Sequence, residues 1–146
     1  MLDETGLSGS SLCLELTETV VMHDENAVAA CFWRLHELGV RIAIDDFGTG
    51  YSSLSVLRRL PFDQLKIDRS VVPDFTSEAY DPVVAAVVGL GRAMGLTVVA
   101  EGVETQAQAE GLRALGCPLA QGFLYGRPMP PSALEQWART HLERRT

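Results

Sequence analysis

Two adjacent carboxylates, Asp45 and Asp46, end an apolar run and stand directly before a glycine-rich turn. Paired carboxylates repel each other unless they bind a hard cation such as Mg²⁺ or Mn²⁺, or accept several hydrogen bonds. For two aspartates alone, a strand end whose aspartate caps the next helix is the simpler interpretation. The other polar residues of the chain favour the metal site.

Five strand-and-helix pairs must position these side chains. Apolar runs predict strands at residues 11–17, 41–45, 64–68, 96–101 and 119–124. Helical periodicity between proline and glycine boundaries predicts helices at residues 26–38, 52–60, 81–94, 105–115 and 131–141. Strict alternation with short connections indicates a parallel sheet covered by helices, either a doubly wound sheet or a (β/α)₈ barrel.

Polar side chains at or near the carboxyl ends of the strands decide between these two folds. They are Glu15, Asp45, Asp46, Lys66, Glu101 and Gln121. Functional groups spread over several strand ends are typical of a barrel, whereas an open sheet gathers them at one switch point. A complete barrel needs about 250 residues. The sequence therefore predicts an α/β fold with parallel strands, a partial TIM-type (β/α) barrel with about five of the eight βα units.

The carboxylates at this rim suit one or two Mg²⁺ or Mn²⁺ ions. Two such ions can activate water and stabilise the leaving oxygen in phosphodiester hydrolysis. Lys66 lies on an otherwise apolar strand and is expected to point into the barrel. It either forms an internal salt bridge, with Asp68 or a neighbouring carboxylate, or holds the attacking water.

Five motifs resemble the EAL domain family in order and spacing. They are Glu15-Leu16-Thr17-Glu18, residues 45–53, Lys66-Ile67-Asp68, Glu101-Gly102-Val103-Glu104 and Gln121-Gly122-Phe123. EAL domains are phosphodiesterases that open the bacterial messenger cyclic di-GMP to linear pGpG. The resemblance implies that cyclic di-GMP is the ligand of this chain.

The resemblance also implies a role for each motif residue. The expected metal ligands are Glu15, Asp45, Asp46 and Glu101, and the expected catalytic residues are Lys66, Gln121 and Glu101. Glu18 would hydrogen-bond to the loop at Ser52, and Glu104 would support the same rim. We expect one domain over residues 1–146, with a lead-in at 1–10, motif-bearing units at 11–130 and a C-terminal helix at 131–146.

The sequence departs from the family because it contains no Glu-Ala-Leu tripeptide. The resemblance implies that about three-eighths of the barrel, with two metal ligands, is missing. We therefore predict that the isolated chain hydrolyses cyclic di-GMP negligibly. The alternative is a non-catalytic, truncated EAL module that binds a ligand or partner in cyclic di-GMP signalling. Sensory or diguanylate cyclase domains often accompany such modules upstream.

Composition limits the partners and the compartment. A net charge of -7 argues against binding to DNA. Three unclustered cysteines predict reduced thiols, and the longest apolar run, residues 83–90, is too short to cross a bilayer, so we expect a cytoplasmic chain without a membrane segment. Unpaired barrel edges at residues 12–17 and 119–124 predict a homo-oligomer. Trp33 and Trp137 are expected to cover the barrel exterior.

Overall fold

The computed structural model describes residues 2–17, 25–48, 54–74 and 81–143. They contain a five-stranded sheet in the order β1-β2-β3-β4-β5, and every neighbouring pair is parallel. The strands are β1 (Cys13–Thr17), β2 (Arg41–Phe47), β3 (Gln64–Ile67), β4 (Thr97–Ala100) and β5 (Leu119–Ala120). Spatial order equals sequence order, as in consecutive units of a barrel, and no reversal creates a switch point. The predicted α/β class with parallel strands is confirmed.

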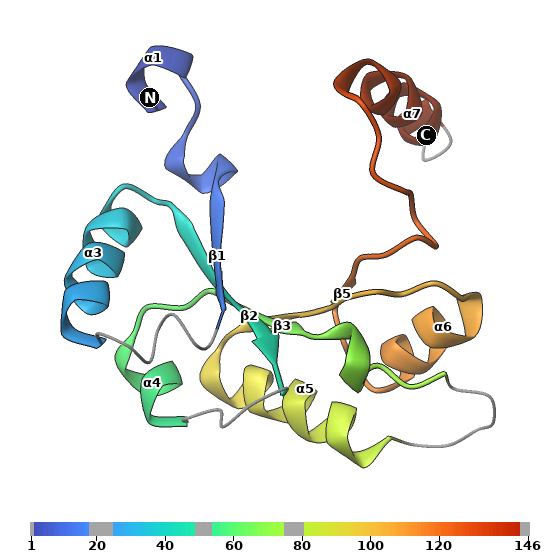
Figure 1. The fold of residues 1–146 in the computed structure, drawn as a ribbon, viewed down its shortest axis with the longest axis horizontal. Coiled ribbons are helices and arrows are strands. Elements are labelled where there is room, and N and C mark those ends of the chain that lie inside the picture. Colours follow the sequence, from blue (N-terminus) through green and yellow to red (C-terminus); the bar gives the residue numbers. More distant parts are fainter. Residues whose placement is uncertain (1, 18–24, 49–53, 75–80, 144–146) are drawn as a thin grey trace.

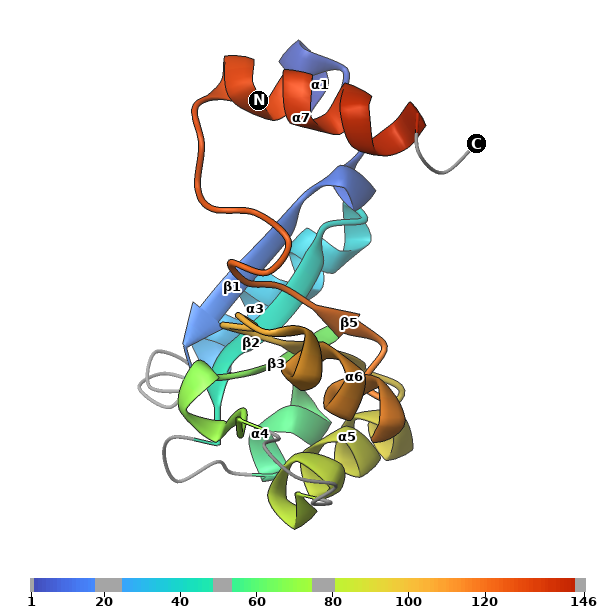
Figure 2. The same ribbon diagram turned by 90° about the vertical axis from the view of Figure 1, so that its right-hand side faces the viewer.

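In the described part of the chain, four helices follow the first four strands in turn. They are α3 (Glu25–Glu37), α4 (Leu54–Arg59), α5 (Pro82–Met94) and α6 (Gln106–Ala114). Figure 1 shows them as an arc along one face of the sheet. The last helix, α7 (Pro131–Glu143), stands apart from this arc at the end of an extended segment, and Figure 2 shows the same separation from the side.

Short helical turns complete the described residues. The turns α1 (Leu2–Thr5) and η1 (Gly9–Ser11) lead into β1, and η2 (Arg69–Val71) follows β3. None of the helices in the described part of the chain is both long and apolar enough to span a bilayer. All three cysteines are free thiols.

The core lies between the sheet and the arc of helices. Every second residue of the central strands is buried there: Ile42, Ile44, Leu65, Ile67, Val98 and Ala100. Helix α3 packs against β2, and α5 packs against β3 and β4. Burial of each large aliphatic side chain stabilises the fold by roughly 1.5–3 kcal/mol. Since the core covers one face of the sheet, the alternate residues of each strand point to the other face.

Helix α5 begins and ends at residues that satisfy its terminal backbone groups. The side chain of Asp81 accepts hydrogen bonds from the backbone N–H groups of Val83 and Val84, both at 2.9 Å, and Pro82 occupies the first turn. Gly95, with a φ of 73°, ends the helix in a left-handed conformation. Both ends match the sequence prediction. The C-terminal end, at Gly95, sets where β4 begins.

Strand β5 is shorter than predicted. It contains Leu119–Ala120 rather than residues 119–124. The N–H of Gln121 still donates to the carbonyl of Ala100, at 2.8 Å, but the chain then turns, and the N–H of Tyr125 donates back to Gly122 at 3.1 Å. Strand β2, in contrast, continues to Phe47, two residues beyond its predicted end. Helix α4 begins at Leu54, and its predicted start at residue 52 lies outside the described residues.

Candidate functional site

An irregularity in β2 brings two adjacent carboxylates to one site. Neighbouring residues of a regular strand point to opposite faces of the sheet. Here Ile44 pairs with Leu65 and Phe47 pairs with Ile67, so two residues of β2 stand opposite one residue of β3. Asp46, one of these two, has a φ of 57°, a left-handed conformation that aspartate tolerates better than most residues. The bulge removes the alternation that would separate the two aspartates.

Three carboxylates converge at this point. Asp45, Asp46 and Glu101 each offer an oxygen, and these oxygens lie within 4.8 Å of one another. The N–H of Asp46 donates to Asp45 Oδ1 at 3.0 Å. Glu101 directly follows β4, and its N–H donates to the carbonyl of Ile67 at 3.0 Å, which continues the sheet pairing. Three oxygen donors at this spacing suit a hard divalent cation such as Mg²⁺ or Mn²⁺.

Lys66 lies at the centre of the rim, on β3. Its Nζ is 2.6 Å from Glu15 Oε2, 2.5 Å from Glu101 Oε1 and 3.3 Å from Asp45 Oδ1. The lysine side chain is only 4% exposed, whereas Glu15 is 47% exposed. Glu15, the fourth carboxylate of the predicted metal set, contacts Lys66, but it does not belong to the group of three carboxylates that could hold a metal ion.

Burial and hydrogen bonding oppose each other at Lys66. Burial by itself lowers the pKa of this amine, but hydrogen bonds to Glu101 and Glu15 outweigh it, so its pKa lies above the ordinary value. Burial raises the pKa of Glu101, against the hydrogen bond from Lys66. The ammonium therefore stays charged at neutral pH. The other partner considered for Lys66, Asp68, instead caps η2 by accepting from the N–H of Ser70 at 2.9 Å.

Of the remaining predicted site residues, two lie in the described part of the chain and two do not. Gln121 Nε2 donates to Glu101 Oε1 at 2.7 Å, the same oxygen that contacts Lys66. Glu104 lies near the rim and pairs with Arg69, its Oε1 3.2 Å from Arg69 Nη2. Glu18 and Ser52, for which a loop contact is predicted, lie outside the described residues.

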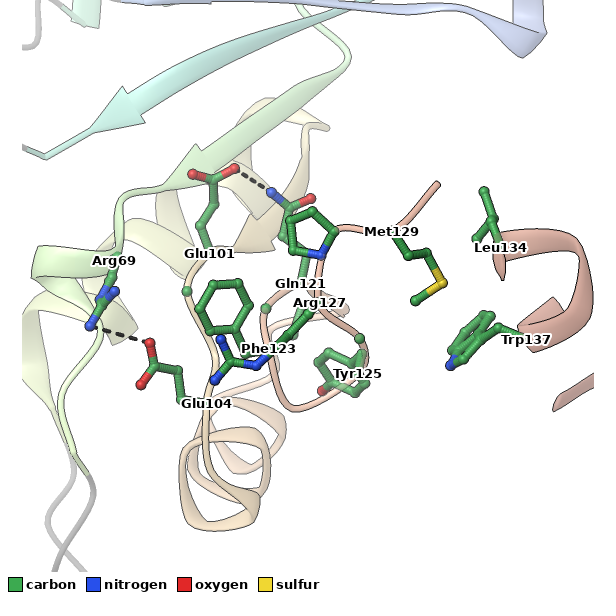
Figure 3. A pocket seen from close by; sticks show the side chains of 15 residues that line it. Arg69, Glu101, Glu104, Gln121, Phe123, Tyr125, Arg127, Met129, Leu134 and Trp137 are labelled. Atoms are coloured by element: carbon green, nitrogen blue, oxygen red, sulfur yellow. Dashed lines mark hydrogen bonds and ion pairs between the residues drawn. The ribbon is translucent and has the colours of Figure 1, made fainter. Parts of the chain in front are cut away.

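A pocket of about 720 Å³ opens beside the carboxylates (Figure 3). Glu101 and Gln121 form its rim side, and the segment after β5 and helix α7 form the opposite side. The lining from that segment and helix includes Phe123, Tyr125, Arg127, Met129, Leu134 and Trp137. The guanidinium carbon of Arg127 lies 4.4 Å from the centre of the Phe123 ring. Aromatic and guanidinium faces together offer stacking surfaces for a planar ligand.

The sequence predicted the rim side of this pocket but not most of its opposite side. Trp137 is expected on the barrel exterior but lines the pocket, and the sequence predicts no role for Arg69 or Arg127. Two signals point to that side. The spacing of Phe123 and Tyr125 after Gln121 places two aromatic rings just beyond a strand end. Residues 128–130 follow the same strand, and Pro128 and Met129 line the pocket.

Gly102 shapes the boundary between the rim and the pocket. Its φ of 65° turns the chain between Glu101 and Glu104. A β-carbon at this position would lie 2.5 Å from Arg69 Cγ. Glycine thus allows Arg69 to cross the chain and reach Glu104.

Comparison with known proteins identifies close relatives. The family model described as "EAL domain" matches residues 1–128. The cyclic di-GMP phosphodiesterase NbdA of Pseudomonas aeruginosa is 46% identical over 141 residues, which is 96% of this chain and 18% of that protein. MucR of the same organism, named a bifunctional diguanylate cyclase/cyclic di-GMP phosphodiesterase, is 51% identical over 129 residues, 88% of this chain and 19% of that protein. The chain thus spans less than a fifth of the length of either relative.

Solved structures give the same result. A MucR phosphodiesterase in complex with c-di-GMP superimposes with a TM-score of 0.81 at 50% identity, over 91% of this chain and 54% of that one. The EAL domain of Mycobacterium smegmatis DcpA gives a TM-score of 0.84 at 48% identity, over 92% and 61% of the two chains. Klebsiella pneumoniae BlrP1, in a complex with manganese and cyclic di-GMP, gives 0.78 at 41% identity, over 87% and 33%.

Proposed function

Because this chain belongs to the EAL domain family, we propose that its strand ends supply the metal-binding and bond-cleaving part of a cyclic di-GMP phosphodiesterase, whose product is linear pGpG. The observation that carries this proposal is the convergence of Asp45, Asp46 and Glu101 within 4.8 Å, beside Lys66 and Gln121. The relatives named as cyclic di-GMP phosphodiesterases support it.

In this proposal the three converging carboxylates hold Mg²⁺ or Mn²⁺, and Glu15 is the fourth carboxylate of the rim. A bound ion of this kind lowers the pKa of a water molecule and offsets phosphate charge. The manganese complex of BlrP1 supports the choice of ion. Lys66 supplies a positive charge at the centre of the rim, and Gln121 orients Glu101 by donating to its Oε1 at 2.7 Å. Both side chains would orient the attacking water.

The pocket beside the rim would receive a base of the nucleotide. Its volume, about 720 Å³, lies within the roughly 300–1,000 Å³ range of small-ligand sites. Phe123 and Arg127 offer the stacking faces, while Glu104 lies on the wall near Arg69. This arrangement would hold the phosphodiester next to the carboxylates.

A binding module without catalysis is the second candidate. One observation favours it: among the described residues that line the pocket, Glu101 is the single proposed metal ligand. Such a module would bind cyclic di-GMP or a signalling partner and would leave the messenger intact.

A chimera separates the two candidates. Residues 12–130 would replace the matching part of the MucR phosphodiesterase domain, and pGpG release would be measured by chromatography with Mn²⁺. We expect activity that Asp45→Asn lowers by about 100-fold or more, because losing a metal ligand costs at least as much as losing its support. A folded chimera without activity would favour the binding module.

The isolated chain is the matched comparison. We expect it to release negligible pGpG under the same conditions, since the five described strands form an open sheet. Release that depends on Asp45 in the isolated chain would contradict this expectation.

The outer strands of the described sheet suggest self-association. β1 and β5 each have a neighbour on one side only, and unpaired strand edges bind other strands. We propose that two or more copies associate through these edges. Light scattering at micromolar concentration should show dimers or larger species, and a uniform monomer would contradict this.

A further inference from the structure

Lys66 contacts two of the carboxylates that a divalent ion would need. Its Nζ lies 3.3 Å from Asp45 Oδ1 and 2.5 Å from Glu101 Oε1. These two residues belong to the group of three carboxylates that could hold a metal ion. A third carboxylate, Glu15, lies 2.6 Å from the same nitrogen. One ammonium thus neutralises part of the charge of three carboxylates.

The sheet holds this ammonium in place. Lys66 lies on β3, paired with β2 on one side and β4 on the other, and its neighbours Leu65 and Ile67 are fully buried in the core. The lysine itself is 3% exposed. Its charge therefore cannot withdraw into solvent without a shift of the central strand.

Electrostatics makes two cations at this site compete. Carboxylates packed together without a cation repel one another, which favours their neutral forms and opposes folding. An ammonium within a few ångströms removes part of this repulsion, but it also repels a second cation that uses the same oxygens. Stability without metal and affinity for metal therefore depend on the same side chain in opposite directions.

We propose that Lys66 is a built-in counter-ion that holds Glu15, Asp45 and Glu101 together in the metal-free protein and weakens divalent metal binding by competing for their oxygens. This inference rests on the proposed function because it takes Asp45 and Glu101 as metal ligands. Lys66 is then a positioning residue before any reaction begins. The coupling is reciprocal: the factor by which the lysine contacts lower the affinity for the metal ion equals the factor by which a bound ion weakens the lysine contacts.

A role of Lys66 confined to orienting water makes a different prediction. In that case the lysine would not oppose the ion, and its removal would leave metal affinity unchanged or lower it. The sign of the change in affinity therefore separates the two roles.

The test measures Mn²⁺ binding by calorimetry and thermal melting in chelator for the full 146-residue chain. Lys66→Gln keeps a hydrogen-bond donor but removes the charge, and Lys66→Met removes both. We expect each neutral variant to bind Mn²⁺ at least about tenfold more tightly, equal to about 1.4 kcal/mol. We also expect a lower melting temperature in chelator and a larger rise on adding Mn²⁺. Lys66→Arg keeps the charge and should bind no more tightly than the wild type.

The outcomes separate this inference from the proposed function. Equal or weaker Mn²⁺ binding by the neutral variants, in a protein whose binding is lost with Asp45→Asn, would overturn the counter-ion role and leave the metal site standing. No Mn²⁺ binding by any form would overturn both. A neutral variant that is unfolded in chelator but folds with Mn²⁺ would support the role strongly, and one that stays unfolded with Mn²⁺ would overturn it.

Discussion

The centre of the sheet and the C-terminal arm, residues 121–143, hold their functional side chains in different ways. At the centre, Lys66 is buried and contacts three carboxylates, one on β1, one on β2 and one directly after β4. In the arm, Phe123 is 47% exposed and Leu134 is 51% exposed, and α7 stands apart from the other main helices (Figure 2). Charge placement therefore depends on packed strands, whereas the apolar pocket wall depends on a segment that adds little to the core.

The largest expected effect tests whether stability resides in the centre. Leu65 on β3 has no exposed surface. We expect Leu65→Ala to lower the free energy of unfolding by about 2–5 kcal/mol, because it leaves a cavity in the core. Urea denaturation would measure this. The arm supplies the control: Leu134→Ala should change stability by less than about 0.5 kcal/mol. Equal losses would show that the arm packs as firmly as the sheet.

Gly102 tests the boundary between the two regions. Gly102→Ala should destabilise by about 2–4 kcal/mol, since it combines a left-handed backbone with a clash against Arg69. Gly95→Ala is the matched control, because Gly95 has a similar φ of 73° but no atom within 4 Å of the added β-carbon. We expect it to cost only about 1–2 kcal/mol. Thermal or urea melts of both variants would give the difference in the free energy of unfolding. Equal losses in the two variants would exclude a contribution from the clash with Arg69.

Helix α5 tests how far support for the centre extends. Asp81→Ala removes the acceptor of two backbone N–H groups at the start of the helix. We expect a loss of about 1 kcal/mol in the free energy of unfolding. Asp81→Asn keeps an acceptor and should be close to neutral. If both substitutions proved neutral, water would be replacing the cap without loss.

The smallest expected effect separates burial from position. Arg69 follows β3 and so belongs to the centre, yet its side chain is 68% exposed and its partner Glu104 is 40% exposed. Arg69→Ala should therefore change stability by less than about 0.5 kcal/mol, as exposed ion pairs usually do. A loss above about 2 kcal/mol in the same urea experiment would mean that position in the centre matters more than burial.

The sequence predicted the first four strands well because their alternating apolar residues and glycine or proline boundaries are local signals. It also placed Asp45, Glu101 and Lys66 at strand ends, which topology alone brings together. It predicted, as one alternative, a salt bridge from Lys66 to Asp68 or a neighbouring carboxylate, but it could not say which carboxylate, because a contact across the sheet depends on strand register. Strand β5 ended early because the chain turns beyond Gln121, and Trp137 reached the pocket because α7 stands apart, which no local pattern encodes.

The bulge in β2 also changes the phase of the strand. Ile42 and Ile44 face the helices, and a uniform two-residue repeat would turn Phe47 to the opposite side, yet Phe47 pairs with Ile67 in the core. Deleting Asp46 would therefore remove one carboxylate and leave a regular repeat in which Phe47 stays on the side of Ile42 and Ile44. Straightening the strand without a deletion would instead send Phe47 out of the core and leave a large apolar gap beneath the rim. The strand can present two adjacent acids only because one inserted residue shifts everything after it by half a period.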